Sequence, residues 1–133
     1  MKMFLDSSAL FAWADASSQA GAAVESYVRT HQPQLVLTNL VFVETISLIT
    51  KRIGKRVGIT FGQHVLRSQI MTIIVIDEAL QQAAWHVYAK YRDKTFDMID
   101  AASFIVCEQR RIKDVLTLDR HFTQMGYTVH PGE

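Results

Sequence analysis

The chain has 133 residues, of which 49% are hydrophobic and 20% are charged. This length and composition predict one globular domain, residues 1–133, with a core that needs no disulfide. The formal net charge of +1 excludes a strongly basic coat, although a local basic patch can still bind nucleic acid. A single cysteine excludes an intramolecular disulfide, and no apolar run approaches the roughly 20 residues of a membrane span. We therefore expect a soluble cytoplasmic protein without a membrane partner.

The first part of the chain alternates short apolar runs with helical patterns. Lys2–Leu5 is predicted to be a buried strand, followed by a short helix over Ala9–Ala14. An amphipathic helix is expected over Gln19–Thr30, and Pro33 prevents it from continuing. Leu35–Leu37 is then predicted to be the second strand.

The middle of the chain carries two helical patterns followed by a strand. Thr38 is placed to cap a helix over Leu40–Arg52, which should end before Gly54. A second helix is predicted over Ile59–Ser68. The run Met71–Ile76 is rich in β-branched residues and predicts the third strand.

The last third of the chain repeats this alternation of helices and strands. The expected elements are a helix over Ala79–Tyr91, a polar loop over Arg92–Thr95, a helix over Met98–Arg110, a strand over Val115–Leu118, a helical turn over Arg120–Met125 and an edge strand over Tyr127–Val129. Continuous apolar strands separated by helices are typical of a parallel sheet that is covered on both faces. The predicted fold class is therefore α/β.

Four acidic residues stand inside or directly after apolar runs, where a solvated surface carboxylate is not expected. These residues are Asp6 in MFLD, Glu44 in LVFVETISLI, Asp100 in FDMIDAASFIV and Asp119 in VLTLD. Burying an ionised carboxylate costs several kcal/mol or more unless a counter-charge or a metal compensates it. One cation shared by all four acids would supply that compensation.

The predicted order of elements places these acids at one edge of the sheet. Asp6 and Asp119 follow strands, whereas Glu44 and Asp100 lie early in helices. Ligands of open parallel sheets bind outside the carboxyl ends of the strands, so all four acids can reach one rim. Oxygen ligands without a Cys or His cluster favour Mg²⁺ or Mn²⁺ over zinc. Metals held in this way commonly bind phosphate oxygens and activate a water molecule.

Four segments resemble, in order, the successive motifs of PIN-domain ribonucleases of the VapC-like toxin type: MFLDSSALFAW, TNLVFVETISLI, FDMIDAASFIV and VLTLDRHFTQMGY. The resemblance covers nearly the whole chain and rests on the four segments together. It implies a PIN-like three-layer α/β/α fold with a central, mostly parallel sheet of four to five strands. It also implies a Mg²⁺- or Mn²⁺-dependent endoribonuclease that hydrolyses RNA phosphodiester bonds as the toxin of a type II toxin–antitoxin pair. The implied partners are an RNA substrate, a cognate antitoxin and a second copy in a homodimer.

The resemblance also assigns roles to individual positions. The four catalytic and metal-binding acids match Asp6, Glu44, Asp100 and Asp119. Ser7 and Thr117 match hydroxyl positions beside the first and fourth acids, where they can orient a carboxylate or a metal-bound water. Asp97 is well placed as a helix N-cap, and we keep it as an accessory acid.

The basic residues and the histidines have structural alternatives. A cluster at KRIGKR is a candidate RNA contact and comprises Lys51, Arg52, Lys55 and Arg56. Cations at a helix C-terminus also complement the helix dipole without any ligand. His121, two residues after Asp119, can touch a phosphate or assist proton transfer, but the sequence favours a surface histidine.

Two other classes of protein remain as alternatives. A receiver-like domain is disfavoured because only one acid follows the first strand and no lysine stands late in the sheet. A catalytically silent PIN-fold module that binds RNA or a partner protein is the main alternative, and the four intact acids argue against it. Two apolar helical faces are candidates for a dimer or antitoxin contact, one around Phe42, Ile46 and Ile49 and one near Phe61 and Val65. Trp85 is expected in the core or in a partner groove.

Overall fold

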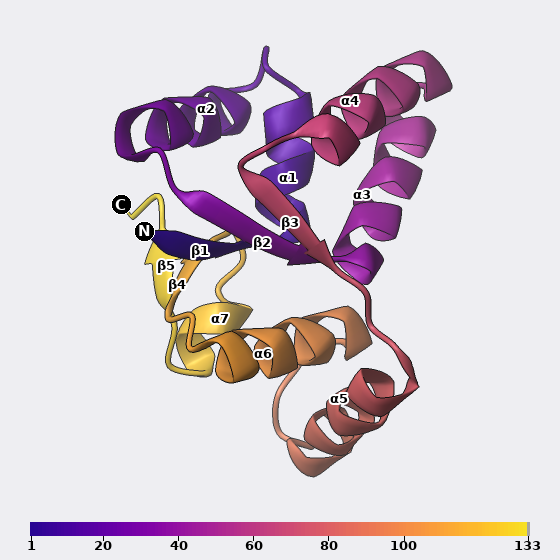
Figure 1. Ribbon diagram of the computed structural model, residues 1–133, viewed down its shortest axis with the longest axis vertical. Helices are drawn as coiled ribbons and strands as arrows, with labels where there is room; N and C mark the ends of the chain where they lie inside the picture. The colour runs from indigo at the N-terminus through magenta and orange to yellow at the C-terminus, as the bar shows by residue number, and fades with distance from the viewer. Residues whose placement is uncertain (133) are drawn as a thin grey trace.

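Parallel strands form the centre of the protein in the order β3-β2-β1-β4-β5 (Figure 1). The computed structural model describes residues 1–132. The strands are β1 (Lys2–Leu5), β2 (Gln34–Thr38), β3 (Met71–Ile74), β4 (Asp114–Leu116) and β5 (Thr128–His130). All four neighbouring pairs in this sheet are parallel, so the carboxyl ends of the strands share one edge.

Helices cover both faces of the sheet, with α1–α4 on one side and α5–α7 on the other (Figure 1). Their bounds are α1 (Ser7–Ala14), α2 (Gln19–His31), α3 (Asn39–Arg52), α4 (Lys55–Arg67), α5 (Glu78–Lys90), α6 (Met98–Arg110) and α7 (His121–Gln124). The predicted α/β fold with a mostly parallel sheet is confirmed, including the edge strand β5. None of the helices in residues 1–132 is both long enough and apolar enough to cross a membrane.

The strand and helix boundaries follow local hydrogen bonds. Thr38 caps α3 as predicted, because its Oγ1 accepts a bond from the Val41 amide at 3.1 Å. β3 ends at Ile74, two residues earlier than predicted, and the amide of Ile76 donates instead to Asn39 Oδ1 at 2.7 Å. β4 also ends two residues early, after which the Leu118 amide donates to Ser8 Oγ at 2.9 Å. These side-chain bonds replace the sheet ladder at the edge where the candidate site lies.

α4 starts at Lys55, four residues before the predicted start, and packs against α3. A Cβ atom at Gly62 would lie 3.3 Å from Ile46 Cδ1, so the absence of a side chain there lets the two helices approach closely. Phe42 and Phe61 pack against the core, and Val65 is buried in it. The apolar faces that the sequence offered for a dimer or an antitoxin are thus largely used in internal packing.

The core lies on both faces of β1, β2 and β4. Met3, Phe4, Leu5, Leu37 and Leu116 are fully buried there. Trp85 does not lie in the core, which was one of the two places expected for it. It is on α5 and is 56% exposed. The burial of β1 up to Leu5 carries directly into Asp6, which is 2% exposed and begins the site.

Candidate metal centre and its pocket

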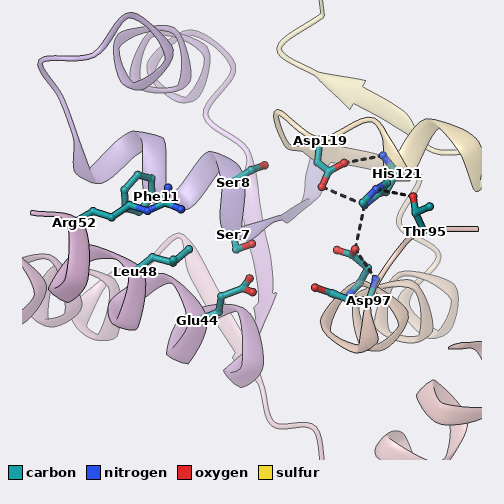
Figure 2. A pocket seen from close by; sticks show the side chains of 11 residues that line it. Ser7, Ser8, Phe11, Glu44, Leu48, Arg52, Thr95, Asp97, Asp119 and His121 are labelled. Atoms are coloured by element: carbon teal, nitrogen blue, oxygen red, sulfur yellow. Dashed lines mark hydrogen bonds and ion pairs between the residues drawn. The ribbon is translucent and has the colours of Figure 1, made fainter.

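A pocket of about 360 Å³ opens at the carboxyl edge of the sheet (Figure 2). It is lined by Ser7, Ser8, Phe11, Glu44, Leu48, Arg52, Thr95, Asp97, Asp100, Asp119 and His121. Two walls face each other across it. The acidic wall consists of Asp6, Asp100, Asp119 and His121, with Asp6 buried behind the pocket surface. The α3 wall consists of Glu44, Leu48 and Arg52.

Asp6 is held by hydroxyl groups from two segments far apart in the sequence. Its Oδ2 accepts bonds from Thr117 Oγ1 at 2.8 Å and from Ser8 Oγ at 2.9 Å. Its Oδ1 is buried and has no hydrogen-bond partner among residues 1–132. Burial raises the pKa of this carboxyl, the two hydroxyl bonds oppose the rise, and Asp119 adds to it. Asp6 therefore presents an oriented carboxylate with one free oxygen.

The hydroxyl positions agree in part with the sequence prediction. Thr117 bonds directly to Asp6. On the other side the bond comes from Ser8, whereas Ser7 lines the pocket. Ser8 also lies 3.0 Å from Thr117 Oγ1, so the two hydroxyls and the carboxylate form one network. The serine pair after Asp6 was visible in the sequence, but the fold decides which hydroxyl turns back to the carboxylate.

Asp100 and Asp97 form a reciprocal capping box at the start of α6. Asp97 Oδ1 accepts from the Asp100 amide at 2.9 Å, and Asp100 Oδ2 accepts from the Asp97 amide at 3.2 Å. Asp97 is exposed, whereas Asp100 is buried. Burial, followed by the charges of Asp97, Asp6 and Asp119, raises the pKa of Asp100 to about 7. The N-cap role expected for Asp97 is present in the structure.

His121 lies between two of the predicted acids (Figure 2). Its Nδ1 is 3.3 Å from Asp100 Oδ2 and 3.2 Å from Asp119 Oδ2. Its Nε2 is 3.2 Å from Thr95 Oγ1, and its backbone amide donates to Asp119 Oδ1 at 2.9 Å. Donor atoms of Asp100, Asp119 and His121 lie within 4.8 Å of one another and could hold a metal ion. The sequence favoured a surface histidine, and only the D-x-H spacing after β4 pointed to this position.

The α3 wall is arranged differently. Glu44 is half-buried on α3, on the opposite side of the pocket from Asp119 and His121 (Figure 2). Arg52 ends the same helix, and its guanidinium carbon lies 5.6 Å from the centre of the Phe11 ring. Lys51, Lys55 and Arg56 are exposed and do not line this pocket. The structure therefore separates Arg52 from the other three cations of the predicted basic cluster.

The residues of the acidic wall fit a divalent cation. The buried Oδ1 of Asp6 has no partner among residues 1–132, and burial raises the pKa of both Asp6 and Asp100. A cation would offset both effects, since an opposite charge nearby favours the ionised carboxylate. The donor set is carboxylate oxygen with one imidazole nitrogen, so it extends the oxygen-only set expected from the sequence.

Comparison with known proteins places this arrangement in a family. The family model described as the PIN domain matches residues 3–126. The chain belongs to the PIN domain family. The match includes both walls of the pocket and all four acids predicted from the sequence.

Curated relatives of this PIN domain are ribonucleases by name. Ribonuclease VapC26 of Mycobacterium tuberculosis is 28% identical over 124 residues, which cover 92% of this chain and 91% of that protein. The 23S rRNA-specific endonuclease VapC20 of the same organism is 22% identical over 125 residues, or 94% of this chain and 95% of that protein. The resemblance to VapC-like PIN-domain ribonucleases is thus confirmed.

Two solved structures share the fold of this PIN domain. The crystal structure of Mycobacterium tuberculosis VapC20, described as a Sarcin-Ricin loop cleaving toxin, has a TM-score of 0.88 at 20% identity. That match covers 96% of this chain and 97% of the VapC20 chain. FitAcB from Neisseria gonorrhoeae has a TM-score of 0.67 at 16% identity and covers 96% of this chain and 95% of its own. The PIN-like fold expected from the sequence is confirmed.

Proposed function

We propose that this PIN domain is a metal-dependent endoribonuclease that hydrolyses RNA phosphodiester bonds as the toxin of a toxin–antitoxin pair. The observation that carries the proposal is the buried Asp6, which keeps one oxygen unpartnered within residues 1–132 and lies close enough to Asp100 and Asp119 for their charges to interact. Asp100 and Asp119 also form a cluster of possible metal ligands with His121. Sequence similarity to VapC26, named a ribonuclease, and to VapC20, named a 23S rRNA-specific endonuclease, supports the reaction class. The target RNA of VapC20 is a property of that protein and defines no target for this one.

The proposed ligands of the ion are the four predicted acids. Asp6, Asp100 and Asp119 would hold Mg²⁺ or Mn²⁺ from the acidic wall, and Glu44 would complete the site from the α3 wall. Hard oxygen donors suit these two ions. When bound, such an ion activates water for attack on phosphorus and offsets the charge that develops on the leaving oxygen. Thr117 and Ser8 would orient Asp6, and Ser7 contributes a hydroxyl to the pocket surface.

His121 is the proposed proton-holding group of the site. Its Nδ1 is within 3.3 Å of carboxylate oxygens from both Asp100 and Asp119, so a proton at Nδ1 can be shared with either acid. The hydrogen bond between Nε2 and Thr95 Oγ1 orients the ring. In this arrangement Nδ1 of His121 can donate a hydrogen bond to either carboxylate of the acidic wall.

The basic turn between α3 and α4 supports an RNA-binding role. Lys51 and Arg52 end α3, where cations complement the helix dipole. Lys55 and Arg56 instead begin α4, where the dipole disfavours them and no acid stands in the first turn. The helix dipole therefore gives Lys51 and Arg52 a structural role but leaves Lys55 and Arg56 without one. Binding to RNA phosphates would give all four cations a role, and we propose it for the cluster.

We further propose a cognate antitoxin and a homodimer as protein assemblies. Large apolar side chains remain exposed on α3 and on the segment after β3, with Val43 58% and Val75 65% exposed. The segment is tied to the start of α3, because Asn39 Oδ1 accepts a bond from the Ile76 amide at 2.7 Å. Light scattering on the purified chain tests the dimer: a mass twice that of the chain supports it, and a monomer at micromolar concentration contradicts it.

Cleavage of a total small-RNA pool tests the enzyme proposal. Purified protein is incubated with Mg²⁺, Mn²⁺ or EDTA, beside the Asp6→Asn variant and an Asp93→Asn control, whose side chain is 79% exposed. We expect discrete products with either ion, with wild type and with the control, and none with EDTA or Asp6→Asn. Cleavage that persists in EDTA, or in a folded Asp6→Asn protein, would contradict the mechanism. RNA binding without cleavage would support the silent module instead.

A further inference from the structure

Arg52 stands on the α3 wall at the end of a stripe that points into the pocket. Glu44, Leu48 and Arg52 follow one another at intervals of four residues, so they lie on one face of α3 and all line the pocket. The helix rise of 1.5 Å per residue places the backbone of Arg52 about 12 Å along α3 from that of Glu44. The stripe therefore leads from the acids toward a cationic end (Figure 2).

The guanidinium of Arg52 is positioned by an aromatic ring. It lies 5.6 Å from the centre of the Phe11 ring, and Phe11 belongs to α1, which packs against α3. A cation–π contact of this kind uses none of the five N–H donors of the guanidinium, which stay available to a ligand. Stacking also limits the conformations of a long side chain, so less conformational freedom is lost when a ligand binds.

Arg52 has no ion pair with a carboxylate within 4.0 Å in the described part of the chain, residues 1–132. Glu44 stands on the same face, but it is two turns away along α3. Planar guanidinium groups bind phosphates through two parallel hydrogen bonds. An oriented, unpaired guanidinium beside a candidate phosphodiesterase centre thus has the chemistry of a phosphate-binding group.

We propose that Arg52, supported by Phe11, binds a backbone phosphate of the RNA strand next to the phosphate that is cleaved. This inference rests on the proposed ribonuclease function. It predicts the path of the RNA strand, which would run from the acidic wall past Leu48 to the basic turn. Arg52 is a positioning residue for the substrate, distinct from the acids that act on the scissile bond. Lys55 and Arg56 follow at the start of α4, but they do not line the pocket.

Steady-state kinetics on a defined substrate test the inference. The substrate is a synthetic oligoribonucleotide that spans a cut site mapped for the wild-type protein in the small-RNA pool. Arg52→Gln should raise KM about tenfold, as expected for loss of a charge-assisted hydrogen bond, with kcat changed less than about threefold. Arg52→Lys should recover part of the loss because it keeps the charge but not the fork. Arg67→Gln, at the exposed end of α4, is the charge-matched control and should match wild type.

A second readout separates phosphate binding from a structural role. Substrates carrying one uncharged methylphosphonate at each phosphate flanking the cut are compared with the all-phosphate RNA. Wild type should lose about tenfold in kcat/KM at one flanking position, and Arg52→Gln should be insensitive to that substitution. The inference is overturned if Arg52→Gln loses as much kcat/KM as wild type at every methylphosphonate position. That result is also the one expected if Arg52 binds an acidic partner protein instead of RNA. Absence of cleavage by wild type would overturn the ribonuclease proposal itself.

Discussion

The acidic wall and the α3 wall line one pocket, but their charged side chains differ in burial and in hydrogen bonding. Asp6 and Asp100 are buried, and both accept hydrogen bonds that fix their orientation. Glu44 is half-buried, and Arg52 is exposed and rests on an aromatic face. The acidic wall is therefore rigid and electrostatically strained before any ligand binds, whereas the α3 wall can adapt to what enters. Rigid carboxylates suit an ion of fixed geometry, and adaptable side chains suit a polymer substrate.

The largest expected effect comes from replacing one acid on each wall. Asp6→Asn should lower cleavage about 1000-fold, because loss of a metal ligand removes several kcal/mol of transition-state stabilisation. Glu44→Gln should lower cleavage about tenfold, since Glu44 is half-buried on the α3 wall and is expected to be a weaker ligand than the buried Asp6. The ratio is measured by single-turnover cleavage with Mn²⁺. Equal losses of cleavage rate in the two variants would show that the two walls contribute equally to catalysis, and would contradict the difference proposed between them.

The variants Asp6→Asn and Glu44→Gln should also differ in their effect on thermal stability. Burial raises the pKa of Asp6 above its unfolded value, so this carboxyl destabilises the metal-free fold at neutral pH, and a non-titrating Asn should raise its Tm. The side-chain oxygen of Asn can still accept the bonds that Thr117 and Ser8 give to Asp6. Glu44→Gln should leave Tm unchanged. A fall in Tm for Asp6→Asn would mean that the carboxylate is compensated in the absence of metal.

Removing the hydroxyl behind Asp6 should have the next largest effect. Thr117→Val keeps the shape of the side chain but removes the 2.8 Å bond to Asp6 Oδ2, so the carboxylate can rotate. Loss of such an orienting partner typically costs about 10- to 100-fold in metal affinity or activity. Mn²⁺ affinity by calorimetry is the measurement. Thr45→Val is the control, because Thr45 is buried equally but bonds only to a helix carbonyl, at 2.8 Å.

The pH dependence of metal binding should follow Asp100. Its pKa is raised to about 7 without metal, so below that pH a proton must leave before an ion can bind. Mn²⁺ affinity should fall about tenfold per pH unit below about 7 and level off above it. The contribution of Asp100 to the stability of the metal-free protein changes in the opposite direction. This contribution is fully present below pH 3.8, the unfolded pKa of the group, and is lost as the pH rises through about 7. Calorimetry and denaturant unfolding at pH 5 to 8 measure both trends, and a flat affinity profile would contradict them.

The sequence predicted the positions of the acids better than the hydrogen bonds that His121 and Ser8 make to them. Asp6 and Asp119 could be placed because acids after parallel strands reach one edge, and Thr38 because a cap has a local signature. His121 could not be placed, since its contacts with Asp100 join α7 to α6 and depend on packing. The choice of Ser8 over Ser7 likewise depends on how β4 returns beside β1. Local patterns fix which elements form, whereas side-chain pairing across elements needs the assembled fold.

The elements themselves show the same division. Helix α6 was predicted with its observed bounds, because its caps and its apolar face are encoded locally. β3 and β4 were predicted two residues too long, since nothing local shows that Asn39 and Ser8 take over their hydrogen bonds. The start of α4 at Lys55 was missed because its N-cap is Gly54, which has no side chain to accept a bond from the first-turn amides and was predicted only as the end of α3.

The smallest expected effect separates the capping role of Asp97 from a metal-binding role. Asp97→Asn keeps an oxygen that accepts from the Asp100 amide, so the free energy of unfolding should change by less than about 0.5 kcal/mol. Asp97→Ala loses this cap and should cost about 1 kcal/mol. Because the charge of Asp97 helps to raise the pKa of Asp100, Asp97→Asn should also move the midpoint of Mn²⁺ binding to lower pH.

Mn²⁺ affinity at pH 8 decides between the two roles of Asp97. Asp100 is ionised there in wild type and in Asp97→Asn, so removing a neighbouring charge no longer changes its protonation. If Asp97 acts only as a cap, the two proteins should bind Mn²⁺ within about threefold of each other, since a long-range charge contributes little in a partly solvated pocket. A loss of tenfold or more at this pH would show that Asp97 contacts the ion and belongs to the acidic wall.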